Sequence, residues 1–116
     1  MYGVVKIGDK EVPMLATASV DIYYKRVFRE DPLSVMTSKT ADDGTKTRVA
    51  FGMGFIMAKF AELKDRRRMM ELNEDAYIEW LDQFDYGDFV SATSDIIGIY
   101  YGQRFSTAKE KKETRP

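Results

Sequence analysis

The chain contains no cysteine and no histidine among its 116 residues. Without cysteine it forms no disulfide, binds no metal through thiolates and has no thiol nucleophile. Without histidine it lacks the side chain that most often serves as a general base and as a metal ligand. These absences argue against catalysis, and we predict a protein that is not an enzyme and has no catalytic residue, no metal site and no cofactor.

Long apolar runs and an excess of one charge are also missing. The chain has 18 basic and 19 acidic residues, and this balance argues against a general affinity for nucleic acid or anionic lipid. No apolar run approaches the roughly 20 residues of a membrane-spanning helix. The opening residues, MYGVVK, do not follow the pattern of a secretory signal. We therefore expect a cytoplasmic protein, with no membrane partner and no specific nucleic acid partner.

What the chain does have is enough apolar material for one core. Hydrophobic residues make up 44% of the sequence, with seven Phe, seven Tyr and one Trp. A chain of this length suits one domain, which we place at residues 1–105. Residues 106–116 are polar and carry charges of both signs, so we predict a disordered tail there.

The N-terminal stretch predicts a β-hairpin. Val5 and Ile7, and again Val12 and Met14, alternate with polar or small residues. With Asp9-Lys10 at the tip, Ile7 would face Val12 and Val5 would face Met14. That register places all four apolar side chains on one face, which must then pack on helices.

Helical periodicity accounts for most of the remaining sequence. The spacing predicts a helix from near Thr17 to 28, a short turn capped by Asp31, a central helix over 47–64, a helix capped by Asn73 and a last helix capped by Asp88. A polar loop over 38–46 precedes the central helix. The expected fold is α+β and mostly α, an N-terminal hairpin followed by a four- to five-helix bundle around a single core.

This order of features resembles the tail assembly chaperones of long-tailed, siphophage-type bacteriophages. That family often opens with a hairpin whose Gly-centred turn precedes a Lys-Glu and an apolar-Pro pair, here residues 5–14. The likeness continues with Asp31-Pro32-Leu33, a long apolar helix over 49–63, and helices opening at Asn73-Glu74-Asp75 and Gly87-Asp88-Phe89. It spans residues 4 to 105. The glycines at 52 and 54 and the arginines at 66–68 are not part of the pattern.

The resemblance implies a non-structural assembly factor of a phage or prophage. Such proteins bind the tape measure protein, keep its apolar helices soluble and recruit tail tube subunits around it, and members of the family can self-associate. An apolar stripe needs a matching surface on its partner, and adaptable methionines help to form one. Two other functions stay open: a structural head–tail connector or adaptor that remains in the particle, and a small DNA-binding regulator.

Seven apolar side chains are candidates for a partner-binding surface. They are Val90, Ile97 and Tyr101 on the last helix, Phe51 and Phe55 on the second side of the central helix, and Met69 and Met70 after three arginines. For each of them the alternative is ordinary packing in the core. The three arginines are candidates for phosphate contacts or, alternatively, belong to a solvated connector.

Overall fold

The computed structural model describes residues 1–114, and the side chains of residues 1–102. Two antiparallel strands, β1 (Tyr2–Ile7) and β2 (Lys10–Leu15), precede six helices in this part of the chain. The helices are α1 (Val20–Phe28), α2 (Pro32–Thr37), α3 (Asp43–Glu62), α4 (Arg66–Met70), α5 (Glu74–Leu81) and α6 (Tyr86–Thr114). The predicted α+β, mostly α fold is confirmed. The additional helix, α4, is a short segment within the stretch predicted as a charged connector.

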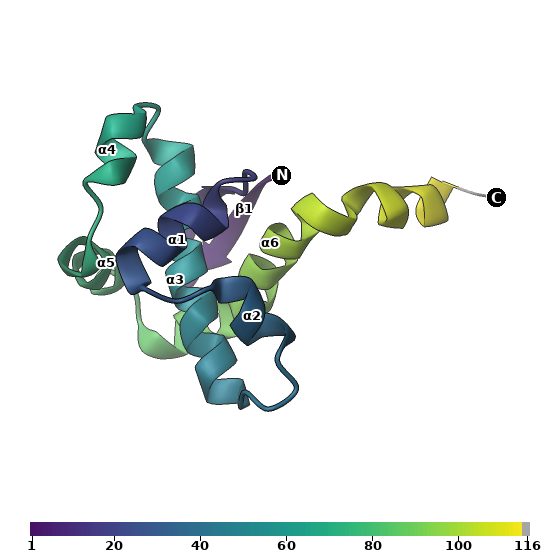
Figure 1. Cartoon of the computed structure of the whole chain (residues 1–116), viewed down its shortest axis with the longest axis horizontal. Helices are drawn as coiled ribbons and strands as arrows, with labels where there is room; N and C mark the ends of the chain where they lie inside the picture. The colour runs from purple at the N-terminus through teal and green to yellow at the C-terminus, as the bar shows by residue number, and fades with distance from the viewer. Residues whose placement is uncertain (115–116) are drawn as a thin grey trace.

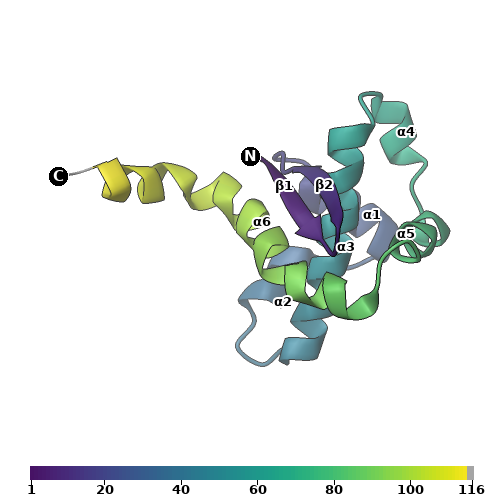
Figure 2. The same cartoon turned by 180° about the vertical axis from the view of Figure 1, so that it is seen from behind.

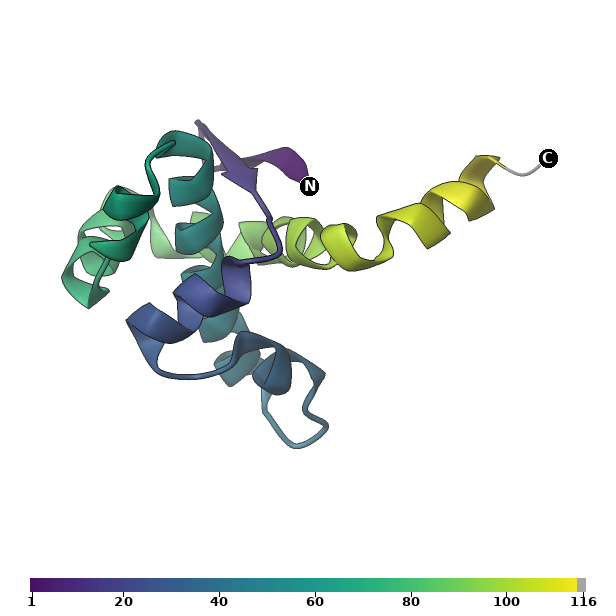
Figure 3. The same cartoon turned by 45° about the horizontal axis from the view of Figure 1, so that its top comes forward.

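α3 runs through the middle of the molecule, as Figures 1 and 3 show. Residues 49–58 are buried without interruption, because α1 packs on one side of α3 while β2 and α6 pack on the other. Two glycines permit this close approach. A Cβ atom at Gly52 would lie 2.7 Å from Tyr24 Cε2 of α1, and one at Gly54 would lie 3.1 Å from Ile96 Cδ1 of α6. α3 is therefore covered on two sides within the monomer.

The hairpin has a different register from the predicted one. Its tip is Gly8–Asp9, where Gly8 has a φ of 63°, and Val5 pairs with Val12. Left-handed backbone at the first tip residue is typical of two-residue hairpin turns and favours glycine. The predicted pairing of Val5 with Met14 is thus wrong by two residues. A shift of two residues keeps the same side chains on one face, so the predicted inner face still packs on the core.

Three helices begin about one turn away from the predicted residue. α3 and α6 start earlier, because the carboxylates of Asp42 and Asp85 each accept the N–H three residues further on, at 2.7 and 3.2 Å. Asp88 is therefore not the cap of α6. α1 starts later, at Val20, after a turn in which the Thr17 hydroxyl accepts an N–H. The caps predicted for α2 and α5 are confirmed at Asp31 and Asn73.

α6 lies against β1 and then leaves the body of the molecule (Figures 1 and 2). The two run antiparallel, because Gly8 adjoins Asp88 at one end and Gly3 adjoins Ile99 near the other. The backbone is helical to Thr114, whereas residues 115–116 and the side chains beyond residue 102 lie outside the described residues. The disordered tail over 106–116 stays a prediction. In the described part of the chain, no helix has the length and apolar character needed to span a membrane.

Candidate interaction surface

The outer face of the hairpin carries three exposed apolar side chains, Tyr2, Val4 and Pro13, beside Leu15, which packs partly against the core. The register pairs Tyr2 with Leu15 and Val4 with Pro13 on this face. Tyr2 is 59% exposed and Val4 is 51% exposed, while Pro13 is exposed and Leu15 is half-buried. Figure 2 shows the hairpin in front of α3, with no helix over it. We call these four residues the hairpin surface.

The hairpin surface arises because the strands carry apolar residues both at the positions that face the core and at the positions that face outward. Val5 and Ile7 face the core, while Tyr2 and Val4 point the opposite way. One solvated face of an antiparallel sheet is normally polar, so an apolar outer face is informative. The apolar character ends toward the tip, where the outer pair is Lys6 with Glu11. The hairpin surface therefore occupies the open end of the hairpin.

A shallow groove adjoins the hairpin surface along β2. It is lined by Lys10, Val12 and Pro13 of the hairpin, Lys59 and Glu62 of α3, and Trp80, Gln83 and Phe84 of the α5 region. The Lys10 ammonium donates to the Gln83 carbonyl at 3.0 Å and lies 5.5 Å from the centre of the Phe84 ring. This contact joins the start of β2 to the segment between α5 and α6.

Three of the seven predicted partner-binding side chains lie in the core. Phe55 and Met69 are fully buried, and Phe51 is nearly so. The Phe51 ring centre lies 4.4 Å from that of Phe89, and the Phe55 ring centre lies 5.7 Å from that of Trp80. In this fold these three side chains stabilise the monomer and are not presented to a partner.

The other four predicted side chains are more accessible but do not form one patch. Val90, Ile97 and Tyr101 share one side of α6, where each is half-buried against the core. The hairpin meets α6 at Ile99, about 200° around the helix from Ile97, so this side is not continuous with the hairpin surface. Met70 is 53% exposed at the end of α4, on a different element.

The hairpin surface is absent from the predicted partner-binding residues, although the sequence contains a signal for it. Besides the apolar set that faces inward, the strands carry a second apolar set at Tyr2, Val4, Pro13 and Leu15. Apolar residues in both phases of a short strand indicate either a strand buried on both faces or a face open to a partner. In a two-stranded hairpin with one face on the helices, the second option applies.

The ionisable groups with raised pKa values belong to a packing cluster between α1, α3 and α5. The Tyr24 hydroxyl donates to Glu30 Oε1 at 2.9 Å, and Arg48 donates to the same oxygen at 3.1 Å. Burial, and then the bond to Glu30, raise the pKa of Tyr24 far above its ordinary value, and burial raises the pKa of Tyr77 to about 12. Both phenols are protonated at neutral pH and offer no general base there.

Metal binding has no support among the described residues, because no three acidic side chains converge on one point. Comparison with known proteins gives no relative: no family model matches the chain, and no curated protein or solved structure matches it significantly. The functional proposal therefore depends on the surfaces of this chain.

Proposed function

We propose that this protein is a tail assembly chaperone of a long-tailed bacteriophage, which binds the tape measure protein and tail tube subunits in the host cytoplasm and catalyses no reaction. The observation that supports this proposal is the hairpin surface. It presents Tyr2, Val4 and Pro13 to solvent, beside a half-buried Leu15, on a hairpin that packs against the buried core. Apolar contact is non-directional, so such a face can hold many different segments of a long helical partner.

The small size of the hairpin surface favours reversible binding. Four side chains cover far less than the roughly 800 Å² per partner of a stable complex. A single contact is therefore weak, and a long partner would engage many copies of the chain at once. Weak repeated contacts suit a factor that tube subunits later displace, whereas a connector that stays in the particle needs a larger permanent interface.

The first experiment co-expresses the chain with the tape measure protein of a long-tailed phage and measures how much tape measure protein stays soluble and co-purifies. We expect Val4→Lys to lower both quantities about tenfold, because it places a charge in the centre of the apolar contact. Val4 is exposed, so the variant keeps its thermal midpoint. Tyr86→Lys is the matched control, since Tyr86 is an exposed aromatic outside the hairpin surface.

Two outcomes would contradict the proposal. Equal solubilisation by wild type and Val4→Lys would remove the hairpin surface as the binding site. Stoichiometric presence of the chain in purified virions, measured by mass spectrometry, would instead identify a structural connector, because a chaperone leaves the finished particle.

A further inference from the structure

Two exposed isoleucines each lie among side chains of one charge. Ile22 of α1 is 62% exposed, and it lines a shallow hollow with three basic residues, Lys25 and Arg26 of the same helix and Arg29 directly after it. Ile78 of α5 is 53% exposed, and its neighbours along the helix include the acidic residues Glu74, Asp75 and Asp82. We call these sets the basic stripe (Ile22, Lys25, Arg26, Arg29) and the acidic stripe (Glu74, Asp75, Ile78, Asp82).

Neither stripe is neutralised within the described part of the chain. The ion pairs found there join Arg48 to Glu30 and Lys59 to Glu62, which belong to neither stripe. Every charged side chain of both stripes is exposed. The basic stripe therefore presents three positive charges around an isoleucine, the acidic stripe presents three negative charges around another, and none of the six forms a salt bridge among the described residues.

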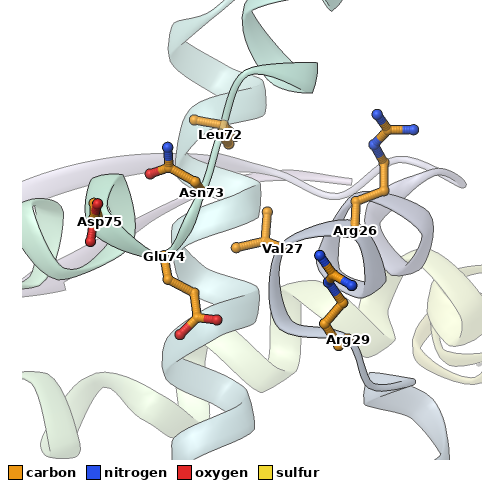
Figure 4. A pocket seen from close by; sticks show the side chains of 7 residues that line it. All are labelled: Arg26, Val27, Arg29, Leu72, Asn73, Glu74 and Asp75. Atoms are coloured by element: carbon orange, nitrogen blue, oxygen red, sulfur yellow. The ribbon is translucent and has the colours of Figure 1, made fainter.

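The two stripes border the same open groove. Arg26 and Arg29 line one wall of it, and Glu74 and Asp75 line the other. Figure 4 shows the two guanidinium groups and the two carboxylates on opposite sides of this groove. The positive and negative halves therefore lie side by side on one surface, close to each other but not joined by an ion pair among the described residues.

We propose that this surface is the interface of a two-fold symmetric dimer, in which the basic stripe of each copy lies on the acidic stripe of the other. A two-fold axis exchanges the halves of an interface, so a surface with a positive half beside a negative half is complementary to itself. Ile22 of each copy then meets Ile78 of the other at two equivalent places. The apolar contacts supply adhesion, and the surrounding charges fix the orientation.

This interface is separate from the hairpin surface and does not depend on the proposed function. Exposed charge pairs are screened by salt, whose Debye length falls from about 10 Å at 0.1 M to about 3 Å at 1 M. We therefore expect a weak dimer whose dissociation constant rises about tenfold between these ionic strengths. Val4→Lys leaves this dissociation constant unchanged, so the failure of one proposal is distinguishable from the failure of the other.

The test is sedimentation equilibrium on the full chain with charge-reversal variants. Lys25→Glu with Arg26→Glu makes both stripes acidic, and Asp75→Lys with Asp82→Lys makes the acidic stripe basic. We expect each double variant alone to dimerise at least about tenfold more weakly than wild type, and an equimolar mixture of the two to recover the dimer. Lys39→Glu with Lys64→Glu is the matched control, because it changes the net charge of the chain by the same amount as the first variant at exposed lysines outside both stripes.

Several results of these experiments would overturn the proposal. The two-fold interface is excluded by a chain that stays monomeric to about 1 mM at low salt, by a mass that rises beyond the dimer, or by a mixture that fails to recover association. Binding of a 20-base-pair DNA duplex by the basic stripe of a monomer would also overturn it. Circular dichroism verifies folding, and Ile22→Gln, which changes no charge, must weaken the dimer even if a reversal variant unfolds.

Discussion

Gly52 shows how one missing side chain allows two helices to approach. A Cβ atom there would lie 2.7 Å from Tyr24 Cε2 and 3.0 Å from Phe28 Cε2, and both rings are packed. Overpacking of this kind costs about 1–3 kcal/mol, against a gain of about 1 kcal/mol in helix propensity. We expect Gly52→Ala to lower the free energy of unfolding by about 1 kcal/mol, measured by urea denaturation.

Gly98 provides the opposite case within α6. It is exposed in the interior of a helix, and a Cβ atom there would meet no atom of the described residues within 4 Å. Gly98→Ala should therefore raise the free energy of unfolding by about 0.5–1 kcal/mol. If both alanines shifted stability in the same direction, the packing explanation for Gly52 would be wrong.

Tyr77 predicts how stability changes at alkaline pH. Burial raises its pKa from 10.0 to about 12, so the unfolded chain loses this proton at a lower pH than the folded chain. The free energy of unfolding should be constant with respect to this group below about pH 10 and fall between about pH 10 and pH 12. Tyr24, whose pKa is also raised by burial, adds to the same loss. Urea midpoints measured from pH 8 to 12 test this, and an equally steep fall in Tyr77→Phe would contradict it.

At the scale of elements, Asp42 determines where α3 begins. Its carboxylate accepts the Thr45 N–H, and this bond holds the pKa of Asp42 below its usual value. The charged cap therefore stabilises α3 above about pH 4, and its contribution disappears as the pH falls through the lowered pKa. The thermal midpoint of the wild type, measured from pH 2 to 7, should fall at acidic pH. The fall should be smaller in Asp42→Asn, because asparagine keeps the acceptor oxygen but does not titrate.

Asp42→Ala serves as the contrast, since it removes the acceptor. We expect it to lower the thermal midpoint at neutral pH. Because the titrating carboxylate is gone, the further fall of the midpoint on acidification should be smaller than in the wild type. If the thermal midpoint of both Asp42 variants fell at acidic pH as much as that of the wild type, other carboxylates would be its cause.

For the whole molecule, the point where α6 leaves the body marks the end of the cooperative unit. Deletion from Ser106 onward should change the free energy of unfolding by less than about 1 kcal/mol, because the tail is predicted to make no stabilising contact. Differential scanning calorimetry of the full and shortened chains measures this. A deletion from Ile97 onward is the contrast: it removes Ile99 and Tyr100, which pack in the core, and should abolish cooperative unfolding. A drop of several degrees for the shorter deletion would show that residues 106–116 are part of the fold.

Local sequence patterns are sufficient to predict the type of most elements and the side of each that faces the core. Period two in the strands and period 3.6 in the helices are local properties of the chain, so they can be read before any packing is known. The caps at Asp31 and Asn73 are local for the same reason. A two-residue error in the hairpin register changed the pairing of Val5 without changing its face, because side chains alternate with period two.

Which apolar residues remain at the surface depends instead on how the elements pack in three dimensions. Phe55 and Val4 are both apolar, yet α5 and its neighbours cover Phe55, while no described segment covers Val4. The adjacency of the basic and acidic stripes is equally non-local, since about 50 residues separate α1 from α5 along the chain. Exposure and adjacency depend on which elements meet in space, and no periodicity within a single element contains that information.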